Sequence, residues 1–385
     1  MTLERRAFKN QTVYIGLQSA FGTPASTFNY LPVESGQLDG EPAAKIELKD
    51  LSPSYSKQGT VNVGAKYSGT YELALRLGGV DQSGNPQSFG ASNLFQSAGL
   101  LESVGKLVTV STSASYVIGE TVEDQVNSGT ATIYGISTGK LYLKGVSGII
   151  ATDTTGLLGL TSTATSTVGT IMPSLVYALN SNINNAKYVT IKHNVAGVQE
   201  LAQDVQCNVK LTLKDSDIAR VSVSNIIGVY SDPESVALGN VSCPSQIPIK
   251  TNPLTVTWGL YDVSTFVIES MDIDLGNTVS EINDAKSSDS ISGVKIEDRM
   301  PKITISMSAP TLASFNPFQN AETNVKQSIA LGVNLTGNAG ERLVVHALAA
   351  QWEYPKKKDN KGLVYYDLNG MLTGCNDNEL FITVY

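Results

Sequence analysis

The chain has 385 residues, of which 41% are hydrophobic and 16% are charged, and its formal net charge is −8. These values describe a folded, weakly charged chain that is long enough for two or three domains. The negative charge argues against nucleic-acid binding, which relies on Lys and Arg to replace the counterions around phosphate. The first residues contain no apolar segment typical of a secretory signal, and no apolar run has the length of a membrane span. We therefore expect neither a secreted nor a membrane protein.

The cysteines and histidines are few and far apart. The cysteines are Cys207, Cys243 and Cys375, and the histidines are His193 and His346. This spacing fits neither a disulfide framework nor a zinc site. Cys207 falls on the apolar face of an alternating segment, which predicts a buried, reduced thiol. Both histidines are expected to be structural or surface residues, although a Ser-His-Asp site is defined in space and stays open at this point.

The first part of the chain predicts alternating strands and one helix. Thr12–Gly16 predicts a strand, and Lys45–Leu51 and Tyr71–Leu77 each alternate between apolar and polar residues. The long polar segment Ser52–Ser68 between the last two predicts an extended hairpin or arm. Residues 90–101 predict a short helix.

Residues 105–172 have a different texture, rich in Thr, Ser and Gly and almost free of large aromatic residues. They predict small hairpins with Gly turns, which form an all-β module. Because the second half of the chain has no counterpart, we interpret these residues as an insertion, and insertions normally lie on the surface.

The chain contains a long internal repeat. Gln203–Gly228 and Glu341–Gly370 each combine an alternating strand, a charged turn, a second alternating strand and a closing Gly. Ahead of them, Asn194 and Asn334 open similar turn sequences at an offset of 334 − 194 = 140. Two further strands match as well: Tyr71–Leu77 and Lys302–Ser308. A repeat this long indicates two copies of a whole domain rather than a solenoid.

The repeat and the insertion divide the chain. We expect a discontinuous first domain at 1–104 and 173–235, the inserted module at 105–172, and a second domain at 236–385. The Pro- and Ser-rich segment Tyr230–Pro253 fits the boundary between the copies.

A search for catalytic or ligand motifs finds little. Gly135–Leu141 (GISTGKL) has three residues between its glycines where a phosphate-binding loop has four, so it predicts a hairpin turn. Asp272 and Asp274 share one strand face with Ser270; they fit metal ligands or a catalytic dyad, but a solvated face is the simpler interpretation. Lys356–Lys358 fit either a phosphate-binding patch or a charged hairpin turn. We predict no enzyme activity, cofactor or metal.

The order of the elements resembles a known family. The segments that carry the resemblance are YIGLQSAFGTPAS, VGAKYSGTYELALRL, ASNLFQSAGL, KYVTIKHNVAG, VQCNVKLTL and VSVSNIIGVYSD. Together they resemble the major tail tube proteins of long-tailed bacteriophages (siphoviruses). The resemblance implies a β-sandwich or partial-barrel domain with one flanking helix. The duplication departs from the family, so we expect a mainly β fold with two tandem domains of this type, each with a short helix, plus the inserted module.

The resemblance also implies a structural role in the virion tail after assembly in the host cytoplasm. Subunits of this family form rings that stack into a tube, and DNA passes through the lumen at ejection without specific binding. The tape measure protein and the tail terminator are the implied partners. Because single-domain relatives form rings of six, two domains in one chain predict a ring of three chains with alternating contacts within and between chains.

Two sets of residues are candidates for this role. The polar faces of the central strands are expected to line the lumen: Glu72, Arg76, Gln206, Asn208, Lys210, Asp272, Asp274, Thr304 and Ser306. Two polar arms are expected to contact the neighbouring ring: Ser52, Tyr55 and Lys57 in one, Asp284, Lys286 and Asp289 in the other.

Two other functions compete with this interpretation. A cell-surface or adhesin-like β-sandwich protein would share the composition, but the absence of a secretion signal and of disulfides argues against it. A carbohydrate-active β-sandwich protein is a second alternative, although the chain offers no convincing pair of acids and only two Trp.

Overall fold

The computed structural model describes residues 11–48, 59–152, 156–238, 241, 245–259, 261, 263–264 and 266–385. Strands dominate these residues, which confirms the expected mainly β fold, and the α-helices are two short ones, α1 (Ser92–Ser97) and α2 (Pro317–Glu322). The expected arm residues Ser52, Tyr55 and Lys57, and also Cys243, lie outside the described residues.

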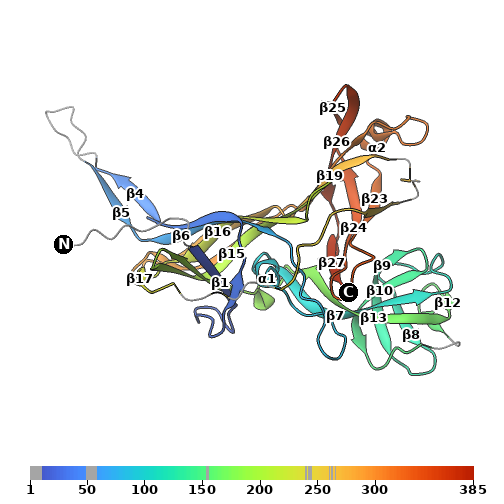
Figure 1. Cartoon of the computed structure of the whole chain (residues 1–385), viewed down its shortest axis with the longest axis horizontal. Helices are drawn as coiled ribbons and strands as arrows, with labels where there is room; N and C mark the ends of the chain where they lie inside the picture. The colour runs from blue at the N-terminus through green and yellow to red at the C-terminus, as the bar shows by residue number, and fades with distance from the viewer. Residues whose placement is uncertain are drawn as a thin grey trace.

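A large antiparallel sheet forms the centre of the molecule (Figure 1). We call the eight strands below the central sheet. In order across the sheet they are β3 (Ser35–Glu41), β6 (Lys66–Ala74), β16 (Arg220–Val229), β15 (Val198–Lys214), β19 (Ile268–Asp274), β22 (Lys302–Ser308), β26 (Leu363–Leu372) and β25 (Lys356–Asn360).

A second layer packs on the apolar face of the central sheet. Its strands are β1 (Gln11–Leu17), β2 (Asn29–Leu31), β14 (Val189–Val195), β18 (Leu254–Trp258), β23 (Lys326–Val333), β24 (Leu343–Trp352) and β27 (Leu380–Val384). Both layers and α1 contribute to one hydrophobic core, in which Trp258, Tyr71 and Phe95 are among the largest buried side chains. The short strand β17 (Glu234–Ser235) pairs with the N-terminal end of β15.

Two series of strands have the same pairing order. The first series is β1–β14–β15–β16–β6–β3, and the second series is β18–β23–β24–β26–β22–β19. In each series the strand before the helix occupies the same place, since α1 follows β6 and α2 follows β22. The long strand β15 of the first series corresponds to two strands in the second, β24 and β25.

A hairpin interrupts each series at the same point. The hairpin β4 (Ala44–Glu47) and β5 (Thr60–Val63) lies between β3 and β6, and the hairpin β20 (Asn277–Asn283) and β21 (Ile291–Arg299) lies between β19 and β22. The β4–β5 hairpin projects from the body, at the upper left of Figure 1. The β20–β21 hairpin instead packs against β15 and β16.

The expected insertion forms a compact β module with its own core. Its strands are β7 (Leu100–Val110), β8 (Thr121–Asp124), β9 (Thr130–Ser137), β10 (Lys140–Ser147), β11 (Leu157–Gly159), β12 (Thr165–Ser166) and β13 (Val168–Leu179). Ile133, Leu141 and Leu157 are buried in a core cluster separate from the main core. The turn between β9 and β10 is the hairpin predicted for GISTGKL, with Gly139 at a φ of 67°.

The module is tied to the second series through its longest strand. β13 pairs with β27, and Leu107, Tyr134 and Tyr142 pack with Phe381 in a third apolar cluster. Because β7 and β13 extend beyond residues 105–172 at both ends, the module and the rest of the chain share continuous strands.

Candidate functional site

The central sheet has one apolar and one polar face, because side chains alternate along each strand. On β19, Met271 and Ile273 are buried, whereas Asp272 and Asp274 point to the other side and remain partly exposed. The second layer covers the apolar face. The opposite side, called the polar face below, is a candidate functional surface, and the β20–β21 hairpin packs on part of it, over β15 and β16.

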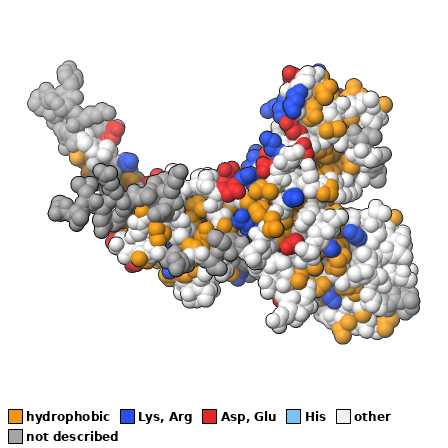
Figure 2. Space-filling model, in the orientation of Figure 1, with side chains coloured by type: hydrophobic (Ala, Val, Ile, Leu, Met, Phe, Trp, Pro, Cys, Tyr) orange, Lys and Arg blue, Asp and Glu red, His pale blue; other side chains and the backbone are white. Residues whose placement is uncertain are grey.

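Acidic and basic side chains face one another across this surface. Lys210 on β15 lies opposite Asp274 on β19, which in turn lies opposite Lys302 on β22. Lys210 Nζ is 2.8 Å from the Asp272 carboxylate, and Lys358 Nζ is 3.2 Å from Glu269. Figure 2 shows such mixed charges side by side along the concave upper outline of the molecule. Because Lys210 and Lys358 are paired with acids, the attraction of these two cations for phosphate is reduced.

Asp272 and Asp274 both have partners within the chain, although Asp272 Oδ1 is buried without a hydrogen bond among the described residues. Asp272 pairs with Lys210, and Asp274 accepts hydrogen bonds from the Asn208 amide at 2.8 Å and from the Gly276 backbone N–H at 2.9 Å. In the described part of the chain, no three or more His, Cys, Asp or Glu side chains gather as metal ligands.

The structure brings most of the predicted lumen-facing residues onto the polar face. Glu72 is exposed, and Lys210, Asp272, Asp274 and Thr304 are partly exposed on it. Ser306 shares this face by register but is only 5% exposed.

Two predicted residues are covered instead of free. Gln206 and Asn208 are buried where the β20–β21 hairpin crosses β15. Asn208 Oδ1 accepts a hydrogen bond from the Asn277 backbone N–H at 2.9 Å, and the Asn277 amide donates to the backbone carbonyls of Ala98 and Cys207. The polar residues of this part of β15 therefore hold the start of β20. The expectation that they face a lumen does not fit their burial.

Arg76 also differs from the expectation. It lies beyond the end of β6, and its side chain lines a cavity of about 240 Å³ together with Leu73, Leu77 and Phe89. The assigned strand ends at Ala74, but the alternation continues, since Leu75 and Leu77 are buried and Arg76 is partly exposed. The Arg76 side chain thus borders this cavity instead of lying free on the strand face.

The second arm has a defined environment within the described residues. The turn that contains Asp284, Lys286 and Asp289 folds back on the same chain, where the Ala65 backbone N–H donates to the Asp289 carbonyl at 3.2 Å. An ion pair of 2.6 Å between Lys66 and Glu281 fixes the hairpin in this position. This hairpin therefore already makes contacts inside the chain. The predicted contact with another ring would involve a segment that is held in place by these contacts.

Both histidines are structural. His193 is 2% exposed and contacts Gln11 and the Tyr71 ring, and burial lowers its pKa. His346 is enclosed by Tyr134 and Tyr142, and burial lowers its pKa to about 3, so it is neutral near pH 7. Within the described residues, no Ser-His-Asp chain of hydrogen bonds includes either ring. Cys207 is a buried free thiol, as predicted.

Lys356–Lys358 form strand β25 rather than a turn, which corrects the predicted hairpin position. The turn follows at Lys361 and Gly362, which both have positive φ angles. The strand extends the central sheet to its outer edge. Strand β18 was not predicted, because its segment LTVTW alternates only briefly. The role of Asn277 in anchoring the hairpin was not predicted either, since it depends on contacts with distant segments.

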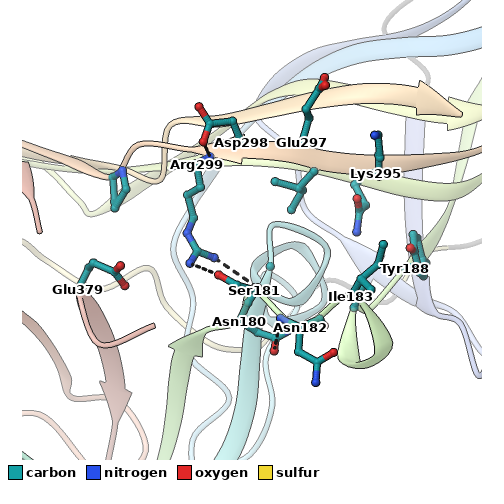
Figure 3. A pocket seen from close by; sticks show the side chains of 15 residues that line it. Asn180, Ser181, Asn182, Ile183, Tyr188, Lys295, Glu297, Asp298, Arg299 and Glu379 are labelled. Atoms are coloured by element: carbon teal, nitrogen blue, oxygen red, sulfur yellow. Dashed lines mark hydrogen bonds between the residues drawn. The ribbon is translucent and has the colours of Figure 1, made fainter. Parts of the chain in front are cut away.

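A cavity of about 540 Å³ lies between β21 and the loops that follow β13 and β26 (Figure 3). Its main cation, Arg299, lies 2.8 Å from Asp377 and donates to Ser181. Burial opposes ionisation of Asp377, but hydrogen bonds from Ser181 and the charge of Arg299 outweigh it and lower the pKa. This network joins three segments of the chain.

Comparison with known proteins identifies no relative. The chain matches no model of a known protein family, and no curated protein is significantly similar to it. None of the helices in the described ranges is long and apolar enough to cross a membrane.

Proposed function

We propose that this protein is the tail tube subunit of a long-tailed bacteriophage, a structural and non-enzymatic protein of the virion. The observation that carries the proposal is the pairing of the two series, β15 to β19, into one curved sheet with two outer edges, β3 and β25. A repeated unit that joins its copy edge to edge and leaves both ends open can continue around a ring.

In this proposal each series is one copy of a tail tube domain. The equal pairing orders, the matching helices and the matching hairpins support the duplication, and the sequence offset of 140 between Asn194 and Asn334 points the same way. Three chains would then supply six copies to each ring.

The polar face would line the lumen. Its paired acids and bases suit a conduit, because DNA that must move through a channel needs a surface that holds water without binding phosphate. The apolar face is already covered by the second layer, so the polar face is the side of the sheet left for this role.

Closed rings would also solve a problem that the isolated chain has. Open sheet edges such as β3 and β25 present unpaired backbone groups that invite uncontrolled aggregation, and a ring removes both edges. The β module would lie outside the ring, since it is attached on the side of the second layer.

Electron microscopy of the purified protein tests the proposal. Concentrated protein should form hollow tubes built from stacked rings. A protein that stays monomeric over a wide range of concentration, salt and pH, or one that binds glycans as a monomer, would favour the adhesin-like or carbohydrate-active alternatives.

A further inference from the structure

The two outer edges of the central sheet differ in charge. Among the described strands, β3 pairs only with β6, and β25 pairs only with β26. β3 carries Asp39 and Glu41, both exposed, whereas β25 carries Lys356–Lys358, also exposed. Lysines on an edge discourage pairing with most strands, so a partner edge for β25 has to supply acids.

The chain already contains one joint of this kind. At the pairing of β15 with β19, Lys210 lies opposite Asp274, and Lys214 lies opposite Ser270. The ion pair between Lys210 and Asp272 reinforces the joint diagonally. A basic edge of the first series thus meets an acidic edge of the second.

Strand registers relate this joint to the outer edges. In the first series, residues that lie opposite one another run from the joint to the outer edge in the order Lys210, Ser222, Glu72 and Ser35. In the second series, they run from the outer edge to the joint in the order Lys356, Asp367, Ser306 and Ser270. Lys356 thus takes the place of Lys210, and Ser270 takes the place of Ser35.

An independent position supports this equivalence. Val198 and Leu343 are the first paired residues after the hairpin turn of each series. Lys210 follows Val198 by 210 − 198 = 12 residues, and Lys356 follows Leu343 by 356 − 343 = 13 residues. The extra residue falls at the break between β24 and β25, where Pro355 cannot donate a ladder hydrogen bond.

We propose that β3 of one chain pairs antiparallel with β25 of a second copy of this chain, with Asp39 opposite Lys356. The register follows from the internal joint: Asp274 lies four residues after Ser270, and Asp39 lies four residues after Ser35. The inference rests on the proposed ring and names the strands, register and charged pair that would close it.

The same pairing between chains also predicts where the projecting β4–β5 hairpin of the second copy packs. Inside the chain, the β20–β21 hairpin covers β15 and β16, so the β4–β5 hairpin of the added copy covers β24 and β26. The exposed apolar side chains Ile46 and Val61 of that hairpin then lie over a cavity of about 380 Å³, which is lined by Trp352 and the exposed Met371.

Disulfide trapping tests the register. In a background with Cys243 and Cys375 replaced by Ser, the pair Asp39→Cys and Lys356→Cys should link chains under oxidation, because directly opposite residues have the spacing of a disulfide. The control pair Ser35→Cys and Lys356→Cys should not, since four residues along a strand span about 13 Å.

Charge reversal tests the recognition. Asp39→Lys alone and Lys356→Asp alone should each raise the concentration needed for assembly about tenfold. Each substitution places two like charges opposite one another at every β3–β25 contact between chains. The chain with both changes should assemble like the original. Circular dichroism should show that all three variants are folded, since both positions are exposed.

The outcomes separate the inference from the proposed function. Tubes that form without the Asp39–Lys356 crosslink would overturn the inference and leave the tail tube proposal standing. The same holds if the charge reversals do not change the concentration needed for assembly. Crosslinking of Asp39→Cys to itself would show pairing between two β3 edges and would also overturn it. A chain that forms no assembly would contradict both the inference and the tail tube proposal.

Discussion

Replacing Asp124 with Asn should loosen the β module without disturbing the rest of the chain. Asp124 is 1% exposed, and its carboxylate accepts hydrogen bonds from the backbone N–H groups of Val126, Asn127 and Ala151 at 2.8–2.9 Å. Burial opposes its ionisation, but these hydrogen bonds outweigh burial and lower the pKa from 3.8 to about 2.

The pKa shift sets the size and the pH dependence of the effect. A shift from 3.8 to about 2 corresponds to about 2 kcal/mol of stability for the module, since one pKa unit is about 1.36 kcal/mol. Because the pKa of Asp124 is depressed on folding, this stability is fully present above pH 4 and is lost as the pH falls towards 2. At pH 3 about 1 kcal/mol remains.

Hydrogen exchange measured by mass spectrometry can localise the change. At pH 7, peptides that cover residues 117–152 should exchange about 30-fold faster in Asp124→Asn than in the original chain. Peptides from β18 to β23 should be unchanged, because the module has its own core and its shared apolar cluster reaches β24 and β27 instead. Glu123→Gln, on the same strand, is the matched control and should exchange normally.

Two results would refute this reasoning. Equal exchange in the variant and the original chain at pH 7 would mean that the carboxylate does not hold the module together. An effect of the same size at pH 7 and pH 3 would mean that the charge of Asp124 is not its cause.

Three further changes test other parts of the account. Asn277→Ala should lower the free energy of unfolding by about 2 kcal/mol in urea titrations followed by Trp fluorescence, because two buried carbonyls lose their donor. Thr70→Lys with Glu72→Lys should make assembled tubes retain double-stranded DNA in a gel-shift assay at low salt, an effect that high salt should abolish. Ile46→Asp with Leu48→Asp should reduce tube yield in sedimentation assays while leaving the monomer folded, since both side chains are exposed in the single chain.

A deletion of the module would expose apolar side chains of the second layer and the C-terminus. Removing residues 105–172 exposes Val344, Phe381 and Tyr385, which now pack against the module. A deletion without further changes would therefore leave an exposed apolar surface that favours aggregation. Polar replacements at Val344 and Phe381 should accompany any deletion that asks whether the module is needed for assembly.

Alternation along the strands made the main elements predictable from sequence. Met271, Ile273, Ile303 and Ile305 are buried as their period of two predicts, and the matching segments around Asn194 and Asn334 do lie at matching turns. These features depend on local pattern, which the sequence carries directly.

Contacts between distant segments were not predictable in the same way. Gln206 and Asn208 alternate like lumen-facing residues, but a hairpin from 70 residues further on covers them. Lys356–Lys358 resemble a turn because three adjacent charged side chains favour contact with solvent. An outer edge strand such as β25 exposes its side chains to solvent as well, so the composition does not distinguish the two. Neither outcome can be predicted from the local composition, because both depend on how distant segments pair.

The symmetry of assembled tubes tests the central claim most directly. Averaged cryo-electron microscopy images should show three chains in each ring, with six similar domains around the lumen and true three-fold symmetry, because the two series differ in sequence and only the first contains the module. A ring of six whole chains, or a lumen lined by the second layer instead of the polar face, would contradict the account.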